Sequence, residues 1–237
     1  MCDCERDALT LACSKQARII KENIIAMESN AFVEFALQRE ALSFGEFTLK
    51  SGRLSPYFFN AGKFNQGEDF TRLGEYYAQT LIDSGIAFDN LFGPAYKGIP
   101  LATAVSIALN MHHQRSVGVT FNRKEAKTHG EAGILVGAAL TGKVVIVDDV
   151  ITAGTAIRES MTIINDSEAE LAAVIVALDR QEKGPEGNSA IQEIEQTYQI
   201  PVLAIARLEH LLAYAQTQST LVQHRERLQA YRQAYGV

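Results

Sequence analysis

The sequence has no apolar segment long enough to cross a membrane. Its longest apolar runs, such as residues 171–178, fall far short of the roughly 20 residues that a membrane-spanning helix needs. The first residues include Asp3, Glu5 and Asp7 in place of the basic and then apolar regions of a signal peptide. We therefore expect neither a membrane partner nor export.

Cysteine is scarce and unevenly placed. The three cysteines, Cys2, Cys4 and Cys13, all fall within the first 13 residues. An odd number, with none in the body of the chain, argues against a disulfide framework and is typical of the reducing cytoplasm, where we expect the protein to lie. A zinc site on these thiols would need a fourth ligand that is not nearby in the sequence, so we expect none.

Positive charge is also in short supply. The 22 Lys and Arg residues face 28 Asp and Glu residues, which gives a net charge of −6. This balance argues against a general nucleic-acid binder, although an acidic protein still binds an anion where its basic residues are concentrated. No internal repeat, low-complexity tract or clear linker divides the chain.

What is present is enough apolar sequence for one well-filled core. The chain has 237 residues, of which 47% are hydrophobic and 21% charged, close to ordinary globular usage. Residues 1–28 lack a clear pattern before Ile19, so we interpret them as a non-catalytic extension. Residues 29–237 are then predicted to form a single domain.

The stretch on which the functional prediction depends covers residues 144–155. Its first four residues are β-branched and apolar, which is typical of a strand buried on both faces. Asp148 and Asp149 follow where that strand should end. A loop of Thr, Ala and Gly comes next, and residues 156–164 have the apolar spacing of an amphipathic helix.

This arrangement predicts a site for a phosphorylated sugar. Loop amides and the positive end of a helix dipole favour a phosphate, because unpaired N–H groups point towards it. The paired carboxylates of Asp148 and Asp149 can accept hydrogen bonds from vicinal ribose hydroxyls and help to hold a hydrated divalent cation.

Four other interpretations explain the same stretch less well. The turn is neither a Walker A loop nor a Gly-x-Gly-x-x-Gly dinucleotide turn, because neither spacing occurs there. A phospho-receiver domain also has paired aspartates, but near its start rather than after roughly 140 foldable residues. An ordinary capped turn explains the strand and the Thr-Gly loop, but not two carboxylates at the strand end where α/β folds keep their ligands.

The remaining chain alternates helices with strands. Such alternation predicts an α/β fold, with a central parallel sheet and helices on both faces. A hairpin is expected over residues 44–60, with Lys50 near its turn and Pro56 at the entry to its second strand. The other predicted elements are helices at 31–41, 70–82, 99–110, 190–198, 208–216 and beyond 221, and strands at 91–93, 116–121, 171–178 and 201–205.

Two places in the sequence put basic residues next to predicted strands or helices. Lys97 comes just before a helix start, where a cation opposes the helix dipole unless an anion is present. Residues 122–133 have no apolar residue larger than Ala but carry Arg123, Lys124, Lys127 and His129. The segment fits either a solvated surface loop or, as we favour, a mobile lid over a polyanion, with glycines 130 and 133 as hinges.

Several motifs in order give the sequence a family resemblance. Residues 147–156 match the signature of the type I phosphoribosyltransferases that binds phosphoribosyl pyrophosphate. Residues 47–59, 93–98 and 121–131 look like the orotate-specific branch of that family, in its bacterial form. The resemblance covers nearly everything from about residue 31 to residue 237, and residues 1–28 are the one clear departure.

This resemblance implies a fold, a reaction and an assembly. The implied fold is the parallel sheet with flanking helices, plus a small N-terminal hood with a β-hairpin. The implied reaction is Mg²⁺-dependent transfer of ribose 5-phosphate from phosphoribosyl pyrophosphate to N1 of orotate, in the synthesis of UMP. It gives orotidine 5′-monophosphate and pyrophosphate. The implied assembly is a homodimer in which the lid of one subunit completes the other's active site.

Residue roles follow from the same motifs and from charge. We assign Lys127 as the main catalytic cation, assisted by Arg123, Lys124 and His129, because the leaving pyrophosphate gains negative charge. No protein metal ligand is assigned, since the substrate itself would carry most of the Mg²⁺ contacts near the two aspartates. The predicted donor-binding residues are Lys50, Tyr96, Lys97, Arg123, Lys124, Lys127, His129, Asp148, Asp149, Val150, Ile151, Thr152, Ala153, Gly154, Thr155 and Ala156.

The predicted orotate contacts lie in three places. Phe58 and Phe59 are placed around the ring, and Thr152 and Arg180 near its polar edge. A guanidinium pairs bidentately with a carboxylate such as that of orotate, although a surface or capping arginine after a strand is equally common. Two alternatives stay open: a phosphoribosyltransferase for another base, and a non-catalytic regulator that senses phosphoribosyl pyrophosphate.

Overall fold

The fold is seen in a computed structural model that describes residues 27–49, 51–127, 133–151 and 154–237. Nearly all of the predicted extension, residues 1–28, lies outside these ranges, so its separation from the domain stays a prediction. Among the described residues, no helix is both long and apolar enough to cross a bilayer.

A six-stranded sheet forms the centre of the protein, in the order β5-β4-β3-β6-β7-β8. All neighbours are parallel except β4 and β5, which pair antiparallel at one edge. This confirms the predicted α/β class with a mainly parallel sheet. The strands are β3 (Asn90–Gly93), β4 (Gly118–Lys127), β5 (Gly133–Gly137), β6 (Thr141–Val147), β7 (Glu168–Asp179) and β8 (Val202–Arg207).

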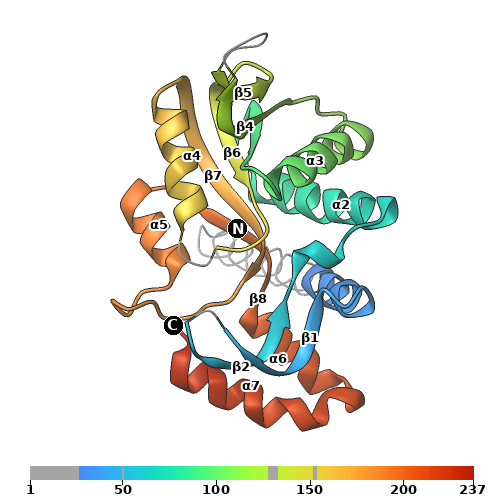
Figure 1. Ribbon diagram of the computed structural model, residues 1–237. Coiled ribbons are helices and arrows are strands. Elements are labelled where there is room, and N and C mark those ends of the chain that lie inside the picture. Colours follow the sequence, from blue (N-terminus) through green and yellow to red (C-terminus); the bar gives the residue numbers. More distant parts are fainter. Residues whose placement is uncertain (1–26, 50, 128–132, 152–153) are drawn as a thin grey trace, which may run out of the picture.

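Helices cover both faces of this sheet (Figure 1). On one face lie α2 (Gly67–Ser84) and α3 (Gly98–His113), and on the other α4 (Thr155–Asn165) and α5 (Ala190–Tyr198). Strand β6 explains why both faces need cover, since its side chains alternate between two apolar cores. Val145 and Val147 join the first core, whereas Val144 and Ile146 join the second, as the run of β-branched residues predicts.

A small hood completes the described chain at one end of the sheet. It holds the antiparallel hairpin of β1 (Leu42–Thr48) and β2 (Leu54–Phe59), preceded by helical residues 27–38. The terminal helices α6 (Leu208–Thr217) and α7 (Val222–Tyr235) lie beside this hairpin, and α7 packs against β2 (Figure 1). Two short 3₁₀ helices, Ala61–Lys63 and Ser219–Leu221, connect these elements.

The structure corrects three sequence-based predictions. The basic segment predicted to be a loop from residue 122 continues β4 up to Lys127, and β5, which we did not predict, pairs with it. The first helix ends at residue 38 rather than 41, because a turn follows in which Glu40 has a φ of 55°. Strand β7 begins at Glu168, three residues before the apolar run that predicted it.

The direction of winding reverses between β3 and β6, and we call the region at the carboxyl ends of these two strands the crevice. The chain leaves β3 through α3 towards β4 on one side, and leaves β6 through α4 towards β7 on the other. Loops that diverge in this way leave a gap at the carboxyl ends of the two strands, where α/β folds bind ligands. The loop of residues 94–97 and the predicted sugar-phosphate loop both begin at this gap.

We predict that Gly98→Ala destabilises the fold, because no room exists for a methyl group. A Cβ at Gly98 would lie 2.5 Å from the Pro94 ring and 2.8 Å from the Val147 carbonyl oxygen. Such overpacking costs about 1–3 kcal/mol. Urea unfolding measures the loss, with Gly67→Ala as the matched control, since a Cβ at that other helix start meets nothing within 4 Å. Equal stability of the two variants would contradict this account of the crevice.

Candidate functional site

Two buried aspartates occupy the carboxyl end of β6. Asp148 and Asp149 are 8% and 6% exposed. The Asp149 carboxylate accepts a hydrogen bond of 2.5 Å from the Lys97 ammonium group, which comes from the loop after β3. The Asp148 carboxylate instead accepts the backbone N–H of Asp149, at 2.9 Å. The ion pair therefore joins the two loops that diverge at the crevice.

Hydrogen bonds from α2 and β7 fix the peptide backbone around Asp148. The hydroxyl of Tyr77, a fully buried residue of α2, donates to the Asp148 carbonyl oxygen at 2.7 Å. The Asp149 carbonyl accepts the N–H of Ala177 at 2.9 Å, and Val150 still pairs with Leu178. The chain thus remains attached to β7 beyond the end of β6, which holds both carboxylates in place.

Asp148 is the titratable group of the site with the clearest perturbation. Burial, followed by the nearby charge of Asp149, raises the pKa of its carboxyl to about 7. The backbone N–H of Asp149 and the charge of Lys97 act in the opposite direction. The carboxyl therefore changes its protonation state near neutral pH.

The predicted phosphate loop ends at the N-terminus of α4. Gly154 is the N-cap residue and has a φ of 67°, a left-handed conformation that glycine adopts without steric cost. Because glycine has no side chain, the N-cap residue makes no side-chain hydrogen bond to the first N–H groups of α4, the groups that bind an anion at a helix N-terminus. Thr155 and Ala156 form the first residues of the helix, while Thr152 and Ala153 lie outside the described residues.

The loop after β3 holds the next group of predicted residues. The Asn122 side chain accepts the N–H of Ala95 at 3.0 Å, and the Ala95–Tyr96 peptide bond is cis. Tyr96 is 69% exposed, and the Lys124 ammonium group lies 5.1 Å from the centre of its ring. The structure thus brings Lys124 next to the loop that presents Lys97.

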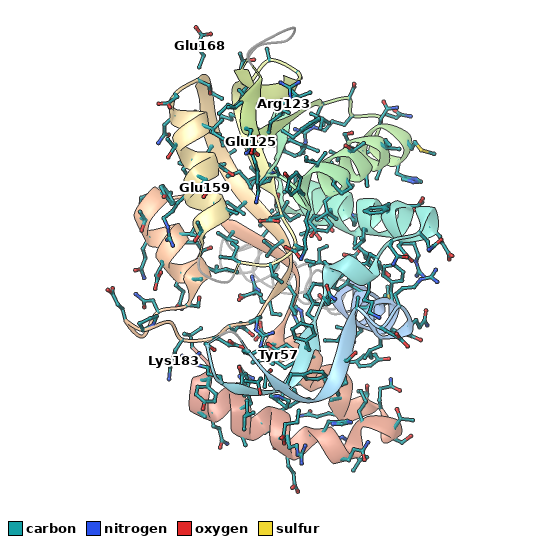
Figure 2. The ribbon with its side chains drawn as sticks, in the orientation of Figure 1. Tyr57, Arg123, Glu125, Glu159, Glu168 and Lys183 are labelled. Atoms are coloured by element: carbon teal, nitrogen blue, oxygen red, sulfur yellow. The ribbon has the colours of Figure 1, made fainter. Side chains whose placement is uncertain are left out.

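The β4–β5 hairpin positions only part of the predicted lid. Arg123 donates through Nη1 to the Gly133 carbonyl oxygen on β5 at 3.3 Å, and Figure 2 shows Arg123 on this hairpin. Lys127 ends β4, and its side chain is not among those described. His129 and Lys50 lie outside the described residues. The lid and these residue roles therefore stay predictions.

The predicted base-binding residues lie in or beside the hood. Phe58 is 41% exposed, and its ring stacks on Phe47 with 5.5 Å between centroids. Phe59 is only 8% exposed and contacts Phe32 and Phe64 in the core. Of the two rings, that of Phe58 is thus the one accessible to a ligand.

Arg180 follows β7 and is held by several neighbours. Its guanidinium forms an ion pair with Glu182, with 2.6 Å between Nη2 and Oε1, and lies 4.5 Å from the centre of the Tyr57 ring. Burial lowers the pKa of Arg180, but Tyr57 and Glu182 outweigh it, so the net shift is upwards. Arg180 is therefore a cation that its neighbours hold in place, and its side chain is only 12% exposed to solvent.

Sequence reasoning missed three residues that support the site. Tyr77 falls within the helix predicted over residues 70–82, and its hydroxyl holds Asp148. Asn122 was included in the lid, yet it fixes Ala95. Glu182 comes shortly after the strand predicted over residues 171–178 and pairs with Arg180. An acidic residue two positions after an arginine was the one available signal.

Comparison with known proteins agrees with this geometry. The model of the phosphoribosyl transferase domain family matches residues 60–201, more than half of the chain. The chain belongs to the phosphoribosyltransferase family. Orotate phosphoribosyltransferases of Serratia proteamaculans and Vibrio cholerae are 59% and 58% identical to it over 206 residues, 87% of this chain and 97% of each relative.

A solved structure supports the same placement within the phosphoribosyltransferases. The orotate phosphoribosyltransferase of Francisella tularensis matches with a TM-score of 0.78 and 45% identity, and covers 87% of this chain and 100% of its own. These relatives place the chain in the orotate branch of the family and confirm the resemblance seen in its motifs. It is therefore a glycosyltransferase-type enzyme whose branch implies a role in pyrimidine synthesis.

We predict that Asp148→Asn makes stability less dependent on pH. The folded-state pKa of about 7 exceeds the ordinary value of 3.8, so the folded protein binds more protons than the unfolded one between these values. Wild-type stability should therefore fall as pH rises through this interval, by on the order of 4 kcal/mol in total. The asparagine variant should lack this loss.

Urea unfolding at pH 5 and pH 8 in metal-free buffer measures this difference. The matched control is Asp166→Asn, an exposed aspartate at the end of α4. If wild type and Asp148→Asn lose the same stability between the two pH values, the buried carboxyl is not the group responsible.

Proposed function

We propose that this enzyme transfers ribose 5-phosphate from phosphoribosyl pyrophosphate to N1 of orotate, which gives orotidine 5′-monophosphate and pyrophosphate. The observation that carries the proposal is the ion pair between Lys97 and Asp149 across the crevice, together with the N-terminus of α4, which has no side-chain cap from Gly154. The proposed site has three parts in sequence: the cation Lys97, the carboxylates of Asp148 and Asp149, and the amides at the start of α4. They match the pyrophosphate, the ribose hydroxyls and the 5′-phosphate of the donor, in that order.

The donor would span the crevice. Its ribose hydroxyls would donate to the carboxylates of Asp148 and Asp149, and its 5′-phosphate would accept the loop and helix amides of residues 152–156. Its pyrophosphate would meet Lys97 and Tyr96 from the loop after β3, with Lys50 from the hairpin turn. The Lys97–Asp149 distance of 2.5 Å supports this placement, because the proposed contacts to the pyrophosphate and to the ribose then lie next to each other.

Magnesium fits the residues that are present. Asp148 and Asp149 supply hard carboxylate oxygens, which Mg²⁺ prefers, and it commonly binds through one or two carboxylates together with substrate phosphates. No cluster of three His, Cys, Asp or Glu side chains that could hold a metal occurs among the described residues. Bound Mg²⁺ would neutralise charge on the pyrophosphate.

Catalysis then requires charge stabilisation and placement. Cleavage of the bond between C1 and the pyrophosphate oxygen develops positive charge on the ribose and negative charge on the leaving group, while orotate N1 forms the new bond to C1. We assign the neutralisation of the leaving group to Lys127, with Arg123, Lys124 and His129 assisting. One preorganised cation contributes about 3 kcal/mol, roughly a hundredfold in rate.

Orotate would lie between the hood and the crevice. Phe58 offers an exposed ring face, and Arg180 offers a buried cation for the orotate carboxylate. The core position of the Phe59 ring supports a contact through its backbone rather than its ring. Thr152 would complete the polar edge of the pocket.

A homodimer is the assembly we propose, with the lid shared between subunits. Its support in the structure is an exposed apolar stripe on α3, where Ile107 and Met111 are 54% and 68% exposed. They stand one helical turn apart and so share a face. Large contiguous apolar patches mark protein contacts, and we propose that these two side chains form part of one. We further propose that the protein lies in the cytoplasm and that residues 1–28 take no part in catalysis.

A substrate panel tests the reaction. Protein, Mg²⁺ and phosphoribosyl pyrophosphate are mixed with orotate, uracil, adenine or hypoxanthine, and loss of each base is followed. We expect consumption of orotate alone, with one pyrophosphate released per base, because only orotate carries the carboxylate that Arg180 would bind. Consumption of another base would favour a different branch of the family. No consumption of any base would favour a regulator that only binds the donor.

Mixed dimers test the shared lid. Lys127→Ala and Asp149→Asn remove groups from the two halves of the proposed composite site, so each variant should lose about a hundredfold in turnover. After the two are unfolded and refolded together, half of the dimers are mixed and each has one intact site. Turnover should then recover to about a quarter of wild type. Refolded single variants are the control, and no recovery in the mixture would contradict sharing.

A further inference from the structure

Glu182 lies at the centre of a compact polar cluster under the hood. Its Oε1 atom accepts hydrogen bonds from Arg180 Nε at 2.8 Å and from the Tyr231 hydroxyl at 2.8 Å. The same oxygen lies 2.6 Å from Arg180 Nη2. The two charged side chains are only 12% and 15% exposed. One glutamate oxygen therefore joins Arg180 to helix α7.

Two residues of β2 fix the guanidinium from another side. The ring of Tyr57 lies 4.5 Å from it, and the Ser55 hydroxyl accepts from Nη2 at 3.2 Å. That hydroxyl donates its own proton to the Tyr57 carbonyl, so its lone pairs face the arginine. Arg180 donates to Glu182 and Ser55 through Nε and Nη2. We therefore take the Nη1 side of the guanidinium, which Glu182 and Ser55 leave unoccupied, as the side that meets a ligand carboxylate.

The segment after Arg180 is also fastened to the last residues of the chain. Lys183 donates its N–H to the Tyr235 carbonyl at 2.8 Å, and Val237 donates to the Gln181 carbonyl at 3.0 Å. Glu182 and Gly236 are bridged as in an antiparallel pair. Lys183 in Figure 2 accordingly lies close to the carboxyl-terminal end marked in Figure 1. Backbone contacts of residues 181–183 and the side-chain contacts of Glu182 thus hold the same short segment.

We propose that Glu182 and Tyr231 are positioning residues that orient Arg180 towards the carboxylate of the base. This inference rests on the proposed function, in which Arg180 meets orotate. A guanidinium recognises a carboxylate through fixed hydrogen-bond directions, so its orientation determines specificity. Glu182 binds one edge of the guanidinium and leaves the other edge for the substrate, while Tyr231 holds Glu182. Helix α7 thereby determines how tightly an acidic base is bound.

The test separates the Michaelis constants of the two substrates. Glu182→Gln should raise the KM for orotate about tenfold, because a neutral amide holds the guanidinium less firmly than a carboxylate does. Tyr231→Phe should raise it about threefold, since it removes one hydrogen bond to Glu182. For both variants, kcat and the KM for phosphoribosyl pyrophosphate should change by less than about twofold, because the donor lies in the crevice.

Matched controls come from the same elements. Glu186→Gln changes an exposed glutamate in the loop after β7, and Tyr235→Phe removes a hydroxyl from α7 with no hydrogen bond in the described chain. Neither should change the KM for orotate. Thermal unfolding of every variant shows whether it is folded, and Tyr231→Phe keeps the test decisive if Glu182→Gln does not fold.

Arg180→Ala distinguishes failure of the positioning role from failure of the proposed base site. If it raises the KM for orotate while Glu182→Gln and Tyr231→Phe leave that constant unchanged, the positioning role is wrong and the proposed base site stands. If Arg180→Ala itself leaves the constant unchanged, the proposed base site is wrong and the positioning role falls with it. Parallel rises in the KM of both substrates would assign Glu182 a merely structural role.

Discussion

The ion pair between Lys97 and Asp149 is the interaction on which the rest of the site depends. Two adjacent carboxylates at the end of a buried strand repel each other and lose hydration, and both effects oppose ionisation. One cation from the neighbouring loop offsets part of this cost at Asp149, while Asp148 has a pKa of about 7. The strand order thus brings Lys97 to the Asp149 carboxylate and offsets part of the cost of burying two adjacent acidic groups.

That strand order explains why the cation is available. Because β3 and β6 are neighbours whose following helices lie on opposite faces, their loops face each other across the crevice without a helix between them. Gly98 allows α3 to begin in contact with Pro94 and Val147, and Tyr77 reaches from α2 to the Asp148 carbonyl. The same packing contacts therefore determine both how the core is filled and where the charged groups lie.

Much of this was predictable from local patterns. The four β-branched residues before Asp148 are buried only if helices cover both faces of their strand. The alternation of strands and helices along the sequence then predicts a parallel sheet. Asp148, Asp149, Lys97 and Gly154 were identified for the same reason, since each stands at a strand end or helix start whose chemistry is visible in the sequence.

The rest depends on contacts between distant residues. The pairing of β4 with β5 extends a basic segment that looks like a solvated loop, and the only sequence signal for β5 is the short apolar run of residues 134–136. The link between Tyr231 and Glu182 joins residues 49 positions apart, and that between Arg180 and Ser55 joins residues 125 apart. Side-chain hydrogen bonds of this kind have no periodic signal, so only the folded chain reveals them.

The most direct measurement is a crystal structure of the protein with phosphoribosyl pyrophosphate and Mg²⁺ bound. The account predicts that the ribose hydroxyls contact the carboxylates of Asp148 and Asp149, that the 5′-phosphate lies at the N-terminus of α4, and that the pyrophosphate lies beside Lys97. A donor bound at any other part of the protein, with the Lys97–Asp149 crevice empty, would contradict it.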